Sequence, residues 1–235
     1  MPAAPWDYSN LPVRPSGKVL SVLGRFVPGI RATHAEVAPY AHAWEQHNAR
    51  AVAADGPLWI VLGDSMAQGI GASAFDRGWP GPLADRLDPS LRMVNLSTYG
   101  ARVVDVLDSQ LPTARLLGDA ALVTVVIGSN DVVWRKYRPD LPAAFGRLLE
   151  ELPAGSVVSN LPNPSAAARE VDRLLRTRGA ERGLLLADIK AHPIAWRGKL
   201  APDFFHPNDA GYAAMADVIE PAVREALAAE RGSQP

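Results

Sequence analysis

A serine stands at the end of an apolar run, in a position suited to nucleophilic chemistry. Residues 58–62 read LWIVL, and Gly63, Asp64 and Ser65 follow directly. A serine hydroxyl becomes a good nucleophile only when a base removes its proton and amides stabilise the oxyanion that forms. A turn from a strand into a helix exposes such a hydroxyl and supplies backbone N–H groups beside it. Ser65 is therefore a candidate nucleophile, provided that the chain also supplies a base.

The glycines that follow offer a second interpretation, a loop that binds phosphate. Residues 69–74, GIGASA, fit the G-x-G-x-x-A pattern of a dinucleotide-binding turn. That turn needs its first glycine at the strand end and an acidic residue at the end of the next strand. Here the strand ends at Gly63, well before Gly69, and residues 95–97 hold no carboxylate. We therefore expect the glycines to form a wall or turn of the active site rather than a nucleotide site.

Histidine is the natural base for a serine, and the chain has 5 histidines. Three precede the first strand and are expected at the solvated surface: His34, His42 and His47. His192 lies in a loop bounded by proline. His206 differs, because Asp203 stands three residues earlier, where a carboxylate on a tight turn can hold the imidazole and fix its tautomer. An ordinary turn role for Asp203 is the alternative, and the presence of Ser65 disfavours it.

These residues are far apart in the chain, so a scaffold must bring their loops together. Five apolar runs are typical of strands buried on both faces: residues 58–62, 92–96, 121–127, 156–161 and 184–189. Helical patterns alternate with them: residues 79–87, 101–117, 140–152, 164–178 and 209–228. Buried strands with intervening helices make a parallel sheet, and its functional residues gather at the carboxyl ends of the strands. The pattern predicts a single α/β domain with a parallel sheet, and we expect a three-layer α/β/α sandwich of flavodoxin-like type with five parallel strands in the order 2-1-3-4-5.

The ends of the chain are expected to lie outside this domain, which we assign to residues 57–229. Residues 1–56 are predicted to be an N-terminal extension with one or two helices packed on the domain, and residues 1–17, rich in proline, to stay at the surface or loose. Pro221 is expected to kink or split the last helix. Residues 230–235 are predicted to be a frayed tail.

One segment of the extension has two interpretations. Residues 18–30 place apolar side chains near helical spacing, with basic residues around them. The favoured interpretation is a helix packed on the domain and ended by Pro28 and Gly29. The alternative is a basic amphipathic helix that contacts a membrane surface. A second helix is expected over residues 35–54, with Pro39 near its first turn.

Composition narrows the class of protein. The 235 residues are 48% hydrophobic and carry a formal net charge of -1. The chain therefore lacks the excess of basic residues that is typical of nucleic-acid-binding proteins. The absence of cysteine excludes disulfides, thiolate catalysis and cysteine–zinc sites. The first residues show no secretory signal pattern, and no apolar run approaches the roughly 20 residues that cross a bilayer. A soluble, cytoplasmic protein is expected.

Taken together, the motifs resemble those of the SGNH (GDSL-type) hydrolases. GDSMAQG matches the family's first block, with Ser65 as the nucleophile, and VNLSTYGARVVDVL is similar to the second, with Gly100 as an oxyanion-hole glycine. IGSND fits the third block, G-x-N-D, in which Asn130 would donate its side-chain amide to the oxyanion. Asp203 and His206 match the last block, D-x-x-H. The four blocks occur in the family's order and cover most of the chain.

The resemblance implies an esterase that uses no metal and no organic cofactor. Its partner would be a small-molecule ester, by default one with a short acyl chain, and no oligomeric state is predicted. A thioesterase, a sugar O-deacetylase or a lysophospholipase would use the same residues. A catalytically silent binding or membrane-docking module on the same fold is the alternative from another class. Four side chains are expected either to line an acyl pocket or to pack ordinarily: Met66, Trp134, Phe204 and Phe205.

Overall fold

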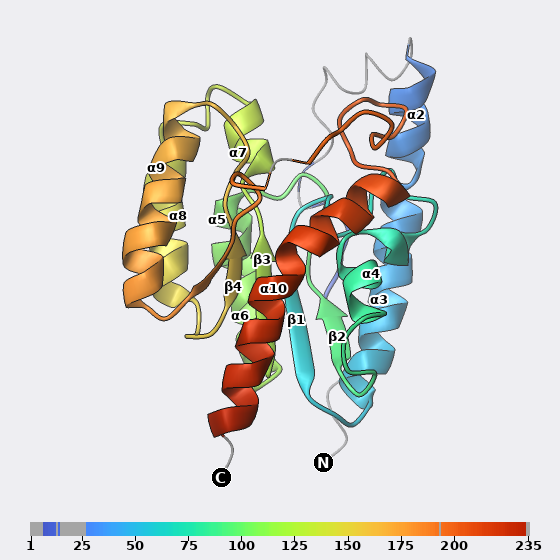
Figure 1. The fold of residues 1–235 in the computed structure, drawn as a ribbon. Helices are drawn as coiled ribbons and strands as arrows, with labels where there is room; N and C mark the ends of the chain where they lie inside the picture. The colour runs from blue at the N-terminus through green and yellow to red at the C-terminus, as the bar shows by residue number, and fades with distance from the viewer. Residues whose placement is uncertain (1–6, 13, 15–26, 193, 234–235) are drawn as a thin grey trace.

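A computed structural model describes residues 7–12, 14, 27–192 and 194–233 of the chain. Its centre is a parallel sheet of five strands: β1 (Leu58–Gly63), β2 (Arg92–Asn95), β3 (Leu122–Val126), β4 (Val157–Ser159) and β5 (Leu185–Ala187). The strands lie in the order β2-β1-β3-β4-β5 (Figure 1), which confirms the predicted topology. The carboxyl ends of β1 and β3 are therefore neighbours, which places the residues after Gly63 beside those after Val126.

Helices cover both faces of the sheet, as the three-layer prediction requires (Figure 1). The described helices are α2 (Pro28–Ala35), α3 (Val37–Ala53), α4 (Pro80–Ala84), α5 (Val103–Asp105), α6 (Leu111–Leu116), α7 (Ser129–Val133), α8 (Leu141–Glu151), α9 (Ala166–Leu174) and α10 (Asp209–Ser233). Three short turns join them: the 3₁₀ turn η1 (Phe75–Arg77) and the π turns η2 (Val106–Gln110) and η3 (Leu175–Gly179).

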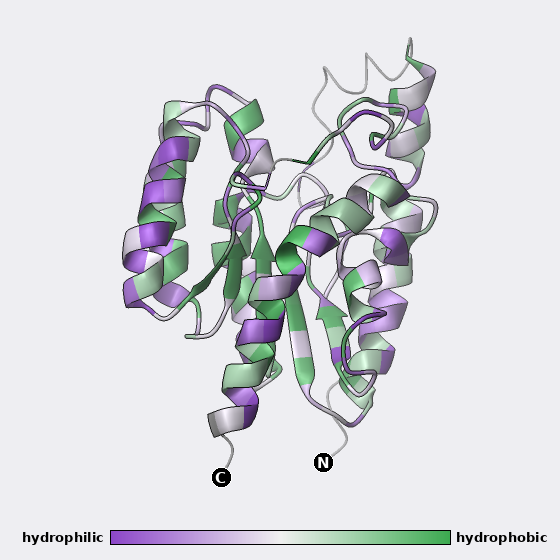
Figure 2. Ribbon diagram, in the orientation of Figure 1, coloured by the Kyte–Doolittle hydropathy of each residue, from purple (hydrophilic) through white to green (hydrophobic). Residues whose placement is uncertain are grey.

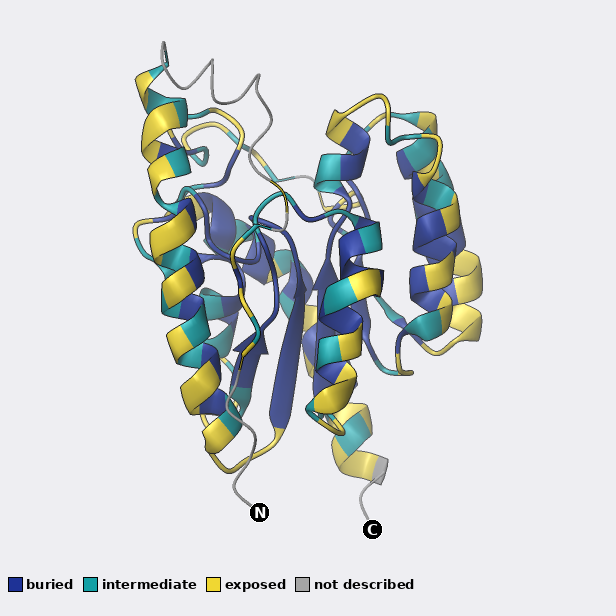
Figure 3. Ribbon diagram, turned by 180° about the vertical axis from the view of Figure 1, so that it is seen from behind, coloured by how far each residue is buried: buried dark blue, intermediate teal, exposed yellow. Residues whose placement is uncertain are grey.

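The strands are mostly apolar because their side chains enter two cores, although β2 also contains Arg92 and Asn95. Successive side chains of a strand point to opposite faces of the sheet. In β1, Leu58, Ile60 and Leu62 pack with the helices α5, α6, α8 and α9, whereas Trp59 and Val61 pack with α3, α4 and α10. The strands are accordingly mostly green in Figure 2 and dark blue in Figure 3, with polar and exposed residues on the outer sides of the helices.

Of the two helices predicted before the first strand, the structure shows the second as expected. The predicted helix over residues 18–30 lies largely outside the described residues, and Pro28 begins α2 rather than ending a helix. Proline suits the first turn of a helix, because the N–H that it lacks would have no partner there. The helix predicted over residues 35–54 is α3, with Pro39 in its first turn. The division at residue 57 stays a prediction, although Trp44 of α3 lies in the same core as Trp59 of β1.

The last helix is longer than the sequence predicts. α10 runs unbroken from Asp209 to Ser233 with Pro221 inside it, so Pro221 does not split the helix, and Figure 1 shows the helix curving along its length. Residues 230–233 continue this helix rather than forming a frayed tail. Buried apolar residues that flank the proline, Ile219 and Val223, hold both halves on the sheet. None of the described helices is long and apolar enough to cross a membrane.

Candidate active site

The predicted nucleophile and base meet at the carboxyl edge of the sheet. Ser65 follows the end of β1, and its side chain lies in a buried position with 3% exposure. His206 precedes α10, 141 residues further along the chain, yet its Nε2 is 3.0 Å from Ser65 Oγ. A hydrogen bond between these two atoms is the contact that general-base activation of a serine requires.

Asp203 holds the other side of the imidazole. Its Oδ2 is 2.6 Å from His206 Nδ1, while its Oδ1 accepts the backbone N–H groups of Phe205 and His206, each at 3.0 Å. The carboxylate is therefore fixed by the turn that it belongs to. With Nδ1–H donating to Asp203, the neutral imidazole presents the lone pair of Nε2 to the hydroxyl of Ser65.

The charge of Asp203 is stabilised by the same contacts. Burial acts to raise the pKa of Asp203, but the hydrogen bond and charge of His206, together with the two backbone N–H groups, outweigh it and hold this pKa below its ordinary value. Asp203 is thus an anion at neutral pH. An anion at this position stabilises the imidazolium that forms when His206 accepts a proton.

The glycine-rich stretch after Ser65 packs behind His206. Gly71 has φ +93°, and a Cβ on it would lie 2.9 Å from His206 Cβ and 2.7 Å from the carbonyl oxygen of Pro207. The N–H of Gly71 donates to Glu36 Oε2 at 2.7 Å. Gly71 is therefore needed for close approach to the histidine turn, and its presence requires no bound phosphate.

The two predicted oxyanion-hole residues belong to loops that are joined to the Ser65 loop. Gly100 has φ +74°, with open space where a side chain would lie. The Nδ2 of Asn130, in α7, donates to the carbonyl oxygen of Ala101 at 2.9 Å and lies 3.5 Å from Asp64 Oδ2. These contacts bring the loop after β2 and the loop after β3 to the residue that precedes Ser65.

Asp64 is a further residue of the site, although the sequence motifs assign it no role. It is 1% exposed, and it accepts hydrogen bonds from Ser129 Oγ and from the backbone N–H of Met66, the latter at 3.0 Å. Burial raises the pKa of Asp64, and the bonds from Ser129 and Met66 oppose that rise. Asp64 thereby ties the serine turn to α7, and its place directly before Ser65 was the available signal.

Asp131 connects α7 to the loop that contains Gly100. Its Oδ2 accepts the N–H of Val103, at the start of α5, at 3.1 Å, which links α7 to the helix after the Gly100 loop. Burial raises the pKa of Asp131 from 3.8 to about 6, against the opposing effects of the Val103 hydrogen bond and of Arg102. Folding therefore favours the protonated form of this carboxyl group.

The raised pKa of Asp131 predicts a pH-dependent effect of Asp131→Asn on stability. Wild type should lose stability as the pH rises from about 4 to about 6, because ionisation opposes folding in that window, whereas asparagine has nothing to ionise. The free energy of unfolding of the variant, relative to wild type, should therefore rise by up to about 3 kcal/mol between pH 4 and pH 8. Urea unfolding at both pH values measures this. The same offset at both would contradict the raised pKa.

A buried asparagine near the N-terminus is hydrogen-bonded to the loop that follows β2. Asn10 is fully buried, and its Nδ2 donates to the carbonyl oxygens of Asn95 at 2.9 Å and Ser97 at 2.8 Å. Gln68 Nε2, three residues after the nucleophile, donates to the Asn10 carbonyl oxygen at 2.8 Å and to that of Ser97 at 3.1 Å. The expectation that residues 1–17 stay at the surface is therefore wrong for Asn10. A polar residue in a proline-rich segment carries no local signal of burial.

The remaining histidines contact other groups. His42 is exposed and lies 2.9 Å from Glu45, and His192 is exposed. His47 is half-buried rather than solvated, because its Nε2 lies 3.1 Å from the carbonyl oxygen of Met93 and its ring packs against Trp44. His34, from α2, is half-buried and its ring meets that of Tyr99 edge-on at 5.7 Å.

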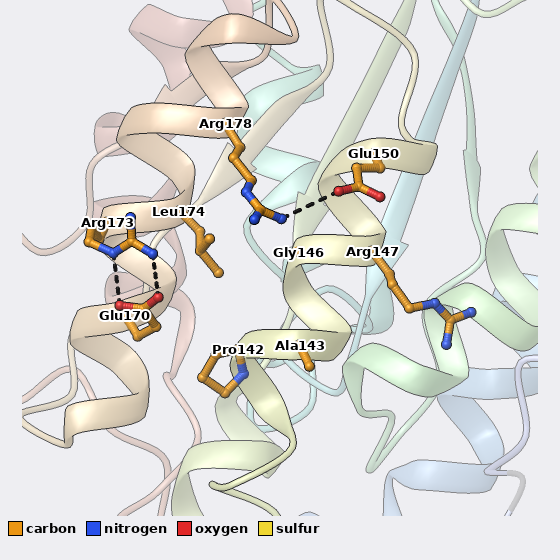
Figure 4. A pocket seen from close by; sticks show the side chains of 9 residues that line it. All are labelled: Pro142, Ala143, Gly146, Arg147, Glu150, Glu170, Arg173, Leu174 and Arg178. Carbon is orange, nitrogen blue, oxygen red and sulfur yellow. Dashed lines mark hydrogen bonds and ion pairs between the residues drawn. The ribbon is translucent and has the colours of Figure 1, made fainter.

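A surface pocket between α8 and α9 lies apart from these residues (Figure 4). Two of its arginines are already neutralised, since Arg173 pairs with Glu170 at 2.5 Å and Arg178 with Glu150 at 3.4 Å. The pocket contains none of the predicted site residues. Within residues 7–12, 14, 27–192 and 194–233, no group of three or more histidine, aspartate or glutamate side chains is placed to hold a metal ion.

Comparison with solved structures shows which proteins share this fold. A family 3 carbohydrate esterase from Clostridium thermocellum superposes with a TM-score of 0.61 at 14% identity, over 74% of this chain and 98% of that one. The esterase EstA from a Pseudoalteromonas species gives 0.57 at 18% identity, over 73% and 98%. An extracellular lipase from Streptomyces rimosus gives 0.54 at 18% identity, over 73% and 100%.

The sequence itself also matches a family. No curated protein sequence matches the chain. The profile of the GDSL-like Lipase/Acylhydrolase family, however, matches residues 61–214, which is more than half of the chain and includes all five predicted site residues. The chain therefore belongs to the GDSL-like lipase/acylhydrolase family and is an ester hydrolase of the SGNH type.

Proposed function

We propose that this protein cleaves small carboxylic esters by two-step acyl transfer, with Ser65 as nucleophile, His206 as base and Asp203 as the residue that orients the base. The observation that carries the proposal is a pair of hydrogen bonds to one imidazole. Ser65 Oγ is 3.0 Å from His206 Nε2, and His206 Nδ1 is 2.6 Å from Asp203 Oδ2. Its location at the carboxyl edge of the parallel sheet, where substrates bind in such folds, supports it.

In the first step, Ser65 Oγ forms a bond to the ester carbonyl carbon while its proton passes to His206 Nε2. The resulting imidazolium is stabilised by Asp203. The tetrahedral intermediate then collapses: the bond to the alcohol oxygen breaks, and His206 returns the proton to that oxygen. The alcohol leaves and the acyl group stays on Ser65.

In the second step, water takes the place of the alcohol. His206 accepts a proton from the water as its oxygen attacks the acyl carbon, and the bond to Ser65 Oγ then breaks as that oxygen recovers the proton. The products are a carboxylic acid and the regenerated serine. The enzyme's own side chains supply every proton transfer in this scheme.

The oxyanion is stabilised by the backbone N–H groups of Ser65 and Gly100 and by the Asn130 side chain. The contact of Asn130 Nδ2 with Asp64, at 3.5 Å, is at the limit of a hydrogen bond, so this N–H is weakly engaged and can turn to the oxyanion. The stronger bond to Ala101, at 2.9 Å, keeps the amide in place.

Replacing Asn130 with alanine is expected to lower kcat by about 10²–10³-fold, with a much smaller change in KM, because the lost donor acts on charge that develops in the transition state. Steady-state kinetics on p-nitrophenyl acetate measure the split. Asn130→Asp, which keeps the shape but removes the N–H groups, should be at least as impaired. A fall in kcat of less than threefold for both variants would contradict this role.

Labelling and a substrate series test the proposed function as a whole. A fluorophosphonate probe should label wild type stoichiometrically at Ser65, since only an activated serine attacks phosphorus. A series of p-nitrophenyl esters from acetate to decanoate then measures the acyl preference, which we expect to favour short chains. Absence of both labelling and turnover would favour a catalytically silent binding module on this fold.

A further inference from the structure

Large apolar side chains that face solvent are concentrated around the proposed catalytic residues. Among the residues that the structure describes, those exposed are Leu11, Leu116, Val133, Trp134, Phe204 and Phe205. Phe204 and Phe205 stand between Asp203 and His206, and Val133 and Trp134 follow Asn130 at the end of α7. Met66, by contrast, packs against the core of α3, α4 and α10, as in the ordinary-packing interpretation.

Phe204 combines exposure with an unfavourable backbone. Its φ is +58°, in the left-handed region that bulky residues avoid. The residue is also 81% exposed to solvent. The turn is imposed by the hydrogen bonds of Asp203 Oδ1 and by the bond from the Phe204 N–H to the Ala201 carbonyl oxygen at 2.9 Å. Glycine or asparagine would fit this turn better, so folding does not explain the phenylalanine.

The aromatic rings of Phe205 and Tyr99 lie beside the imidazole of His206. The ring of Phe205, a residue 41% exposed, meets it edge-on with centroids 4.9 Å apart. The ring of half-buried Tyr99, the neighbour of Gly100, lies 6.1 Å from it at 31°. His206 is therefore flanked by apolar surface on the loops that reach it, and part of that surface is open to solvent.

The direction of proton transfer decides which part of an ester would contact this surface. His206 must deliver its proton to the alcohol oxygen, so that oxygen lies next to the imidazole in the first step. The acyl group, which becomes attached to Ser65, extends from the other side of the carbonyl carbon. The side chains nearest to the imidazole are thus placed to contact the alcohol portion of the substrate rather than its acyl chain.

We propose that Phe204 and Phe205, with Tyr99, form a binding surface for an apolar alcohol portion of the ester, and that Phe204 is a specificity-determining residue. This rests on the proposed function. The exposed aromatic surface would be covered on substrate binding, which gives a physical reason for an aromatic residue in a strained, solvent-facing position. The substrate class is then an ester of a short acid with an apolar alcohol.

Alkyl acetates test this surface, because their alcohols are similar in acidity and differ mainly in apolar area. For wild type, kcat/KM should rise by roughly 2-fold per methylene from methyl to hexyl acetate. Phe204→Asn and Phe204→Gly should flatten this rise, with a loss of about 5–10-fold on hexyl acetate and less than 2-fold on methyl acetate. Each ester is assayed below and above its solubility limit, and the variants are compared by their rates below it.

Two controls separate substrate recognition from a structural effect. Leu116→Asn removes another exposed apolar side chain, 87% exposed, at the end of α6 and before β3, so it should leave the whole series unchanged. A second series, from methyl acetate to methyl hexanoate, varies the acyl chain instead, and the Phe204 variants should keep the wild-type dependence on acyl length. Both Phe204 variants should also raise the melting temperature, because they relieve the backbone strain.

Four results would overturn the assignment. The first is an equal loss for the Phe204 variants on the alcohol and acyl series, and the second is no loss on either. A chain-length effect that appears only above the solubility limit would point to docking on a lipid surface instead. Lastly, wild type that is neither labelled by a fluorophosphonate nor active on any ester would refute the proposed function itself. If wild type is labelled and active but the Phe204 variants give either of the first two results, only this inference is refuted.

Discussion

Ser65→Ala is expected to lower kcat for p-nitrophenyl acetate by at least about 10⁴-fold, leaving the protein folded. The substitution removes the atom that bonds to the acyl carbon, so no acyl-enzyme can form. What remains is the binding of the ester by groups such as the amide of Asn130. Because the substitution removes a single buried atom, the Oγ that contacts His206, it should change the melting temperature little.

The measurement combines turnover with labelling and thermal unfolding. The variant should show neither a burst of p-nitrophenol nor reaction with a fluorophosphonate, at a melting temperature within a few degrees of wild type. Ser90→Ala is a matched control, since Ser90 is an exposed serine whose hydroxyl bonds to Asp88 at 2.7 Å, and it should behave as wild type. Retention of more than a hundredth of wild-type turnover by Ser65→Ala would refute the nucleophile assignment.

Asp203→Asn should cost about 10⁴-fold in kcat, nearly as much as loss of the nucleophile. Asparagine can keep one oxygen for the backbone N–H groups of Phe205 and His206, which preserves the turn. Its NH₂ group then faces Nδ1 and forces the imidazole proton onto Nε2, where no lone pair is left for Ser65. The imidazolium also loses the anion that stabilises it.

A stability measurement distinguishes this effect from loss of the turn. The variant should keep its cooperative thermal unfolding while its rate of fluorophosphonate labelling falls in parallel with kcat. Asp217→Asn is the control, because Asp217 lies on α10 and pairs with Arg86 at 2.6 Å on the exposed surface. If Asp203→Asn kept wild-type turnover while unfolding earlier, Asp203 would be only a turn residue, the alternative that the sequence leaves open.

Much of the fold could be predicted from the sequence because its signals are local. The strands lie in stretches dominated by apolar residues, and such a stretch predicts cover on both faces of the sheet. β1 shows this, with Ile60 in one core and Trp59 in the other. Short elements were missed for the same reason. α7, with five residues from Ser129 to Val133, is too short to show a helical period.

The motif residues could be chosen from the sequence, but their distances could not. Ser65 and His206 are 141 residues apart, and only the parallel pairing of β1 with β3 and the packing of α10 on the sheet place their side chains 3.0 Å apart. The burial of Asn10 depends on carbonyl oxygens of Asn95 and Ser97 that lie more than 80 positions away. No periodicity records such a partner.

The sequence by itself determined the strands, their parallel arrangement and the chemical groups available at their ends. Only the tertiary structure decided that Asp64 is tied to Ser129, that Asn10 supports the loop before Gly100, and that Phe204 is exposed in a left-handed turn. The physical reason is that the hydropathy pattern that marks a strand or helix lies within a short stretch of the chain. Hydrogen-bond partners and backbone strain, in contrast, are set by whatever the completed packing brings into contact.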